Sequence, residues 1–305
     1  MRKDVTACII ALFLMMALPT SIAKPAVDTD SGPVFGGQHS DVNNASNQTS
    51  QISLLPAVAE DFTATWCQNC VKVEHALDDL EEEGMIQKYE FHVSPNLDDS
   101  PFGSDEIMQH LNSRYGIYSP PLVAINGTTM KEGSHPESNS LINDYREMIA
   151  LPLNLGNGFS TFGWTPQANC SCDLPENMGI ISWDLDADLS AYPNATLSVN
   201  AWIVEGATEF SDGSNGQGTY YDVVTDIIEL GNEAKGIANI SIPTANDGDD
   251  LEIHLIYLIT LPEIIEQPEI IKDEDSGALP GFGIVLSLVA CLLAATMVRR
   301  EDSIA

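Results

Sequence analysis

Asp61-Phe62-Thr63-Ala64-Thr65-Trp66-Cys67-Gln68-Asn69-Cys70 is the stretch that decides the expected fold. Its first half belongs to an apolar segment from Val58 to Thr65 that is typical of a strand, and its second half contains two cysteines separated by two residues. Apolar residues at helical spacing then predict a helix from about Gln68 to Glu83, which Gly84 ends. The sequence therefore predicts a strand that delivers a Cys-x-x-Cys pair to the first turn of a helix.

The segments that follow have the pattern of a small α/β domain. In chain order we expect a strand at Tyr89 to Val93, a helix capped by Ser104 and reaching Arg114, a strand at Leu122 to Ile125, a hairpin turn at Asn126-Gly127, a strand at Thr128 to Lys131 and a helix at Glu137 to Ile149. The order βαβαββα predicts one domain over residues 52–151.

The rest of the mature chain is interpreted from its composition. Residues 24–51 are rich in Ser, Asn, Asp and Gly, and we expect a flexible spacer. Residues 152–178 are expected to be a linker, and alternating apolar residues in 179–261 predict a β-sandwich. The expected architecture is thus an α/β domain followed by a separate all-β sandwich.

The cysteine pair Cys67 and Cys70 predicts thiol–disulfide chemistry. A helix N-terminus favours a thiolate, so the pKa of Cys67 is expected below the ordinary value of about 8.5. Cys67 would attack a disulfide, and Cys70, one turn further on, would resolve the mixed disulfide. An inert structural disulfide is the alternative.

Zinc binding is a further alternative, because half of a zinc site has the same Cys-x-x-Cys spacing. No second pair completes four ligands, since Cys170 and Cys172 are one residue apart, and His75 and His92 fall in ordinary helix and strand patterns. We therefore expect no metal and no cofactor.

Residues 61–70 resemble the active-site strand of the thioredoxin family, whose buried acid and tryptophan fall on Asp61 and Trp66. Tyr115-Gly116-Ile117, followed by Pro120-Pro121, is similar to the family's second signature. The resemblance implies a thioredoxin fold over residues 52–151 and a cis-proline at Pro121 opposite the cysteines. Asp61 lies six residues before Cys67 and alternates with Phe62, so we expect it beneath the cysteines with a raised pKa.

The pairing of such a domain with a β-sandwich resembles a family of bacterial outer-membrane proteins with thioredoxin domains. Ala201-Trp202-Ile203-Val204-Glu205 is similar to a strand of their second domain. The resemblance implies an accessory or binding role for the sandwich.

The two ends predict export and anchoring. Residues 1–23 have the basic, apolar and small-residue pattern of a signal peptide. An acidic stalk at 262–278 leads to an apolar run at 279–298, long enough to span a bilayer, and Arg299-Arg300 begin an expected cytoplasmic tail at 299–305. Pro280-Gly281-Phe282 before this run resembles the PGF-CTERM sorting signal of archaeal surface proteins, which implies cleavage by an archaeosortase and a lipid anchor.

Charge, cysteines and sequons fit an exported protein. A formal net charge of −33 excludes binding to nucleic acid through phosphate neutralisation. For Cys170 and Cys172 we favour a structural role, either as a tight disulfide or as two cysteines that fasten the linker to the sandwich; the alternative is a second redox pair or an electron relay to Cys70. Asn-x-Ser/Thr sequons, candidate glycosylation sites, begin at Asn44, Asn47, Asn126, Asn169, Asn194 and Asn239.

Together these features predict an extracytoplasmic thiol–disulfide oxidoreductase, anchored in the membrane through its C-terminus with its body facing outward. Its partners would be thiols and disulfides of exported proteins and an unidentified electron donor or acceptor. The expected site is Cys67, Cys70, Asp61, Trp66 and Pro121. The alternative is a cell-surface binding or adhesion protein that uses a thioredoxin fold as scaffold.

Overall fold

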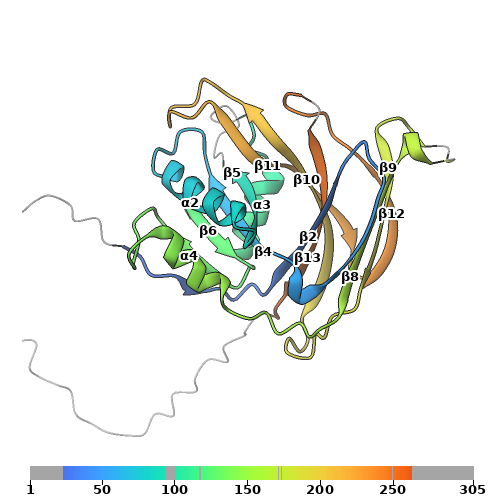
Figure 1. Cartoon of the computed structure of the whole chain (residues 1–305), viewed down its shortest axis with the longest axis horizontal. Helices are drawn as coiled ribbons and strands as arrows, with labels where there is room; N and C mark the ends of the chain where they lie inside the picture. The colour runs from blue at the N-terminus through green and yellow to red at the C-terminus, as the bar shows by residue number, and fades with distance from the viewer. Residues whose placement is uncertain are drawn as a thin grey trace, which may run out of the picture. The chain divides into compact units, whose positions relative to one another are not determined.

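The computed structural model describes residues 23–93, 101–116, 118–170, 172, 174–248 and 250–262 (Figure 1). The helices in chain order are η1 (Ile52–Leu54), α2 (Cys70–Glu82), α3 (Asp105–Arg114), α4 (Leu141–Ile149) and η2 (Gln167–Asn169). The strands are β1 (Val27–Asp28), β2 (Val34–Asp41), β3 (Ser46–Gln51), β4 (Ala57–Thr63), β5 (Ile86–His92), β6 (Leu122–Ile125), β7 (Thr129–Glu132), β8 (Phe159–Pro166), β9 (Met178–Leu185), β10 (Thr196–Glu209), β11 (Thr219–Gly231), β12 (Lys235–Ser241) and β13 (Leu251–Thr260).

The described strands form two sheets. Nine strands form a mixed sheet in the order β1-β7-β6-β4-β5-β11-β10-β13-β2, and four form a second sheet in the order β12-β9-β8-β3. β4 is parallel to β5 and antiparallel to β6, while β5 joins β11 through the pair Glu90 and Val223. In Figure 1, α2 and α4 lie at one side of this body, and β8, β9 and β12 lie at the other.

The expected thioredoxin-type α/β fold followed by a separate all-β sandwich is wrong. The described chain is predominantly β, with α2, α3 and α4 as its α-helices, and the large sheet runs through both expected domains. Trp202 of β10 shows the reason, because its ring packs edge-on against Tyr89 and Phe91 of β5. These aromatic contacts make one core out of residues that the sequence analysis assigned to two domains.

The strands β10 and β13 were misread because both of their faces are buried. Trp202 and Ile256 belong to the core shared with β4 and β5, whereas Ala201 and Tyr257 belong to the core between the two sheets. A strand buried on both faces has a continuous apolar run, as in residues 255–259. A half-buried sandwich strand instead alternates.

The expected spacer at 24–51 and linker at 152–178 are also corrected. The spacer contains β1, β2 and β3, and Val34 and Phe35 of β2 are buried. The linker contains β8, whose buried Phe162 and Trp164 alternate with partly exposed residues. β3 is an edge strand of polar residues, so its composition resembles that of a spacer although its backbone pairs with β8.

The expected helix cap and hairpin turn agree with the structure. Ser104 caps α3 by accepting a hydrogen bond from the Ile107 amide at 3.2 Å. Asn126 and Gly127 have positive φ angles of 51° and 67° between β6 and β7.

The signal peptide, apart from Ala23, lies outside the described residues. So do the stalk beyond residue 262, the apolar run, the tail and the sorting residues Pro280, Gly281 and Phe282. Among the described residues, no helix is long and apolar enough to cross a membrane.

Candidate functional site

Cys67 and Cys70 form a disulfide between the end of β4 and the start of α2. Their Cα atoms are 5.4 Å apart. Cys67 retains 6% of its surface exposed and Cys70 none, so an attacking thiolate reaches Cys67 more readily. Trp66, immediately before Cys67, is 40% exposed and offers an apolar surface at the entrance to the disulfide.

Pro121 lies just before β6, beside the end of β4 that leads to the cysteines. The peptide bond between Pro120 and Pro121 is cis. Leu122, the next residue, pairs with Phe62 of β4, so Pro121 is placed where β4 ends and the turn to the cysteines begins. The buried side of this turn is thus formed by two neighbouring strands.

Asp61 is completely buried in β4 and lies in an acidic cluster with Glu74 and Glu90. Asp61 pairs with Glu90 of the parallel strand β5, and one carboxylate oxygen from each of the three residues lies within 4.8 Å of the others. Glu74 is one helical turn after Cys70, which places the cluster under the first turns of α2. Neither carboxylate oxygen of Asp61 has a hydrogen-bond partner among the described residues.

Burial raises the pKa of two of these carboxyl groups. Burial, and then the charges of Glu74 and Glu90, raise the pKa of Asp61 well above its ordinary value. Burial, and then Glu90, raise the pKa of Glu74 to about 7. Glu90 differs: burial acts to raise its pKa, but the Lys88 ammonium and His92, through their charges and hydrogen bonds, together lower it. Asp61 and Glu74 therefore take up protons more readily than ordinary carboxyl groups.

Basic and hydrogen-bonding groups already occupy much of this cluster. The Lys88 ammonium lies 3.1 Å from Glu90, and Nε2 of His92 lies 3.5 Å from the other Glu90 oxygen. The Thr63 hydroxyl donates to Glu74 at 2.5 Å. With a buried ammonium among the carboxylates, we interpret the cluster as a proton reservoir and not as a metal site.

A loop at residues 210–218, between β10 and β11, packs against the turn that carries the cysteines. The Asn215 amide donates to the Thr65 carbonyl oxygen at 3.0 Å, and the Gln217 side chain donates to Glu74 at 2.5 Å. Gly213 makes this approach possible, because a Cβ there would lie 2.9 Å from the same Thr65 oxygen. A segment about 150 residues after the cysteines in sequence thus helps to hold their surroundings.

The sequence analysis missed Glu74, Lys88, Glu90 and Gln217, and it assigned His92 to an ordinary strand pattern. Lys88, Glu90 and His92 carried a signal, since they occupy every second position of a buried strand, where charged residues are rare. Glu74 also falls on the apolar face of α2. Gln217 carried no signal, because its role depends on the contact between the loop and the helix.

The remaining expected sites have varied surroundings. Cys170 and Cys172 form a disulfide just after η2. Of the six sequon residues, Asn126 is buried, and its side-chain oxygen accepts a hydrogen bond from the Val58 amide at 2.9 Å. The folded chain therefore does not present Asn126 as a glycosylation site. The exposed sequon residues are Asn44, Asn47, Asn169, Asn194 and Asn239.

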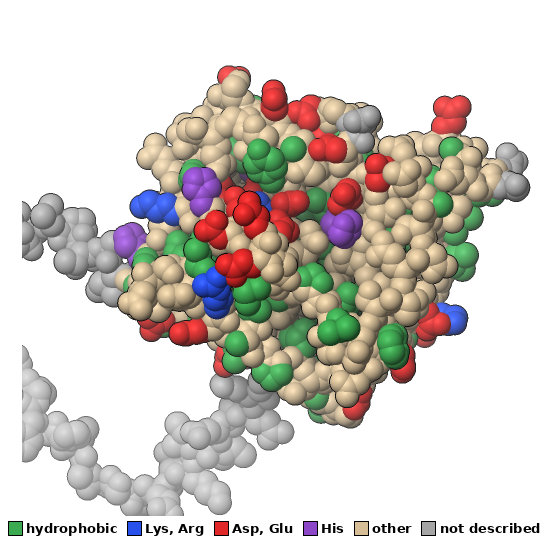
Figure 2. Space-filling view, in the orientation of Figure 1, with side chains coloured by type: hydrophobic (Ala, Val, Ile, Leu, Met, Phe, Trp, Pro, Cys, Tyr) green, Lys and Arg blue, Asp and Glu red, His purple; other side chains and the backbone are tan. Residues whose placement is uncertain are grey.

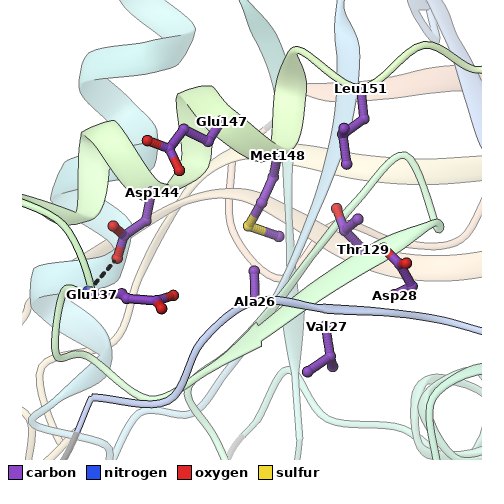
Figure 3. A pocket seen from close by; sticks show the side chains of 9 residues that line it. All are labelled: Ala26, Val27, Asp28, Thr129, Glu137, Asp144, Glu147, Met148 and Leu151. Atoms are coloured by element: carbon purple, nitrogen blue, oxygen red, sulfur yellow. Dashed lines mark hydrogen bonds between the residues drawn. The ribbon is translucent and has the colours of Figure 1, made fainter.

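The described surface carries an acidic face (Figure 2) and a pocket at β1, β7 and α4. Acidic side chains gather on the face shown in Figure 2, over the helical part of the body. The pocket in Figure 3 lies between β1, β7 and α4, with Asp144, Glu147 and Met148 projecting from the helix. None of its lining residues belongs to the cysteine site.

Comparisons with known proteins show only distant structural likeness. No protein-family model and no curated protein matches the chain. HBP35 of Porphyromonas gingivalis is 17% identical with a TM-score of 0.44, and the match covers 74% of this chain and 80% of that one. A protein from Agrobacterium tumefaciens is 15% identical with a TM-score of 0.38, covering 69% of this chain and 96% of that one. Likenesses this low assign neither a fold nor a function to this chain.

Proposed function

We propose that the chain is a thiol–disulfide oxidoreductase that acts on exported proteins through Cys67 and Cys70. The observation behind this proposal is the disulfide at the first turn of α2, with Cys67 the more accessible sulfur and the protonatable Asp61 and Glu74 nearby. The Trp-Cys-x-x-Cys resemblance to the thioredoxin family supports the activity at the level of the motif.

The proposed exchange begins when a substrate thiolate attacks Sγ of Cys67. A mixed disulfide forms, the bond between Cys67 and Cys70 breaks, and Cys70 leaves as a thiolate that takes up a proton. A second substrate thiolate then attacks the substrate sulfur of the mixed disulfide. This releases the oxidised substrate, and the chain keeps the two electrons as its dithiol. The reverse sequence reduces a substrate disulfide.

The buried carboxyl groups suit the proton transfer in this exchange. The raised pKa of Asp61 makes it bind a proton more readily than an ordinary carboxyl group, and in the proposed exchange it would supply that proton to the Cys70 thiolate as the disulfide opens. In the reverse direction it accepts the proton when Cys70 attacks the mixed disulfide. Asp61 would be the proton-transfer residue, and Glu74 would position it and adjust its charge.

The activity is tested with the full-length chain and a model disulfide in the presence of a dithiol. Cys67→Ser should abolish reduction, and Cys70→Ser should accumulate mixed disulfides through Cys67. Cys170→Ser is the matched control, since it removes a cysteine of the other disulfide. A Cys67→Ser protein as active as the wild type would overturn the proposal and favour a binding protein.

We also propose that this body is exported and anchored through residues 279–298. The five exposed sequon residues and the two disulfides suit an extracytoplasmic location. Removing residues 279–305 should release the protein from the membrane fraction, whereas removing only 301–305 should leave it bound. Mass spectrometry of the mature C-terminus distinguishes a retained apolar segment from a lipid-modified end. A 279–305 deletion that stays membrane-bound would contradict the anchor.

A further inference from the structure

Two histidines and a glutamate meet at the edge of the large sheet, on strands β2 and β13. His39 of the edge strand β2 lies directly opposite His254 of β13, and Glu252 is two residues before His254 on the same face. Nε2 of His254 lies 3.1 Å from Oε2 of Glu252, and Nε2 of His39 lies 3.9 Å from the same oxygen. The donor atoms of the three residues all lie within 4.8 Å of one another.

The hydrogen bonds of both rings leave Nε2 facing the glutamate. Nδ1 of His39 lies 3.0 Å from the Gly37 carbonyl oxygen, which only accepts, so Nδ1 carries the proton and Nε2 a lone pair. Nε2 of His254 lies 3.1 Å from the Glu252 carboxylate, which only accepts, so this nitrogen carries the proton, and Nδ1, 3.0 Å from the Tyr89 hydroxyl, accepts from it. An ion bound at Nε2 would displace that proton, and Nδ1 would then carry a proton and donate to the Tyr89 oxygen.

We propose that His39, Glu252 and His254 bind a divalent metal ion of the zinc type. Two imidazoles and one carboxylate are a ligand set that suits Zn²⁺ better than Mg²⁺ or Ca²⁺, which take oxygen ligands. Neighbouring ligands of a tetrahedral zinc lie about 3.3 Å apart, close to the observed separations from Glu252. The Gly37 carbonyl and the Tyr89 hydroxyl would hold the two rings in orientation through hydrogen bonds to their Nδ1 atoms.

Binding needs a small rotation of His39. The two rings are stacked with centroids 4.5 Å apart and an interplanar angle of 14°, so the rings lie face to face and do not point toward a common centre. The His39 side chain is 41% exposed and the Glu252 side chain 38%, while His254 is held in the core. The exposed ligands can therefore turn toward an ion placed by His254, and water can take its open position. The ion would tie the edge strand β2 to β13.

The site is tested by calorimetric titration of the full-length, oxidised chain, carrying no polyhistidine tag, with ZnCl₂ in a millimolar excess of Mg²⁺. Oxidation keeps Cys67 and Cys70 from acting as ligands, and Mg²⁺ saturates the acidic surface. We expect one Zn²⁺ per chain and a raised thermal unfolding midpoint. His39→Ala and Glu252→Gln should each weaken binding at least about 100-fold. Losing a residue that only orients a metal ligand already weakens metal affinity about 10–100-fold, and these two residues are ligands themselves.

Matched variants separate this site from other cation-binding groups. His75→Ala removes an exposed histidine of α2, and Glu74→Gln removes a carboxylate of the buried cluster; neither should change Zn²⁺ affinity. Tyr89→Phe should weaken binding about 10-fold through the His254 ring. Co²⁺ in place of Zn²⁺ should give visible d–d absorption that His39→Ala abolishes. Equal Zn²⁺ affinity in wild type, His39→Ala and Glu252→Gln would overturn the proposal, as would full competition by Mg²⁺.

Discussion

The side-chain amide of Gln217 donates a hydrogen bond to Oε2 of Glu74 at 2.5 Å, across 143 residues of sequence. This bond connects the loop at 210–218 to the helix that begins at Cys70. It favours the ionised form of Glu74, because an amide N–H stabilises a carboxylate, and so it opposes the effect of burial on the Glu74 pKa. The loop therefore influences how readily the acidic cluster gives up its proton.

Gln217→Ala should raise the pKa of Glu74 above its value of about 7. One hydrogen bond to a charged group is worth about 1.5–3 kcal/mol, so we expect a rise of about one unit. Carbon-detected NMR titration of the Glu74 carboxyl measures it directly. Ser214→Ala, in an exposed position of the same loop, is the control. A Glu74 titration that does not move would show that the bond has no effect in solution.

The stability of the fold should depend on pH through Glu74. Its pKa rises from 4.5 to about 7 on folding, so the folded state binds more protons between these values and the free energy of unfolding falls as the pH rises from about 4.5 to 7. Below pH 4.5 the contribution is fully present. Across this window it is on the order of 3 kcal/mol at most.

Glu74→Gln should flatten this part of the profile and leave a more stable protein at pH 8. Urea unfolding at a series of pH values measures the difference between the two profiles. Glu82→Gln, at an exposed position of the same helix, should follow the wild type. Parallel profiles for wild type and Glu74→Gln would mean that Glu74 ionises normally in the folded chain.

Lys88 should be indispensable for stability because it balances a buried charge. Its ammonium is 1% exposed and lies 2.5 Å from Asp78, 3.1 Å from Glu90 and 3.5 Å from Asp222. Lys88→Met leaves the Glu90 carboxylate buried without its cation, so we expect a loss of about 3–5 kcal/mol in denaturant unfolding.

Two further variants test this explanation of Lys88. Lys72→Met, at an exposed position of α2, should change little. Adding Glu90→Gln to Lys88→Met should restore part of the lost stability, because it removes the uncompensated charge. If the double variant is as unstable as Lys88→Met, the loss of stability comes from the packing of the Lys88 side chain and not from the uncompensated Glu90 charge.

Local signals could be predicted from the sequence, and long-range pairings could not. The turn at Asn126-Gly127, the Ser104 cap and the burial of Asp61 follow from residues within a few positions of one another. The pairing of β2 with β13 and the packing of Trp202 on β5 join residues more than 100 positions apart. No periodicity reports such contacts, so one continuous sheet was interpreted as two domains.

The same limit applied to the candidate sites. The Cys-x-x-Cys pair is contiguous and was visible in the sequence. The meeting of His39 with Glu252 and His254 depends on strand register across more than 200 residues, and His39 had been assigned to a flexible spacer. The interpretation of residues 24–51 from composition thus concealed both a strand and a ligand.

Asp61 is the most stringent test of the proposed exchange. Its carboxyl group is fully buried, has no hydrogen-bond partner among the described residues and shares its surroundings with Glu74, one turn after Cys70. Because its pKa is raised, Asp61 binds a proton more readily than an ordinary carboxyl group, so in the proposed exchange it would give a proton to the Cys70 thiolate and accept it in the reverse step. Asp61→Asn keeps the shape of the side chain but cannot exchange a proton in this range.

Asp61→Asn should therefore slow resolution of the mixed disulfide about 10²-fold, which is the lower end of general-base effects. It should also raise the denaturant midpoint at pH 8, because an amide removes the cost of ionising a buried carboxyl group. Stopped-flow measurement of mixed-disulfide resolution and a urea melt check the two effects separately. Asp79→Asn, on the exposed side of α2, is the matched control and should alter neither. A raised midpoint with an unchanged rate would leave Asp61 as a destabilising buried acid without a role in proton transfer.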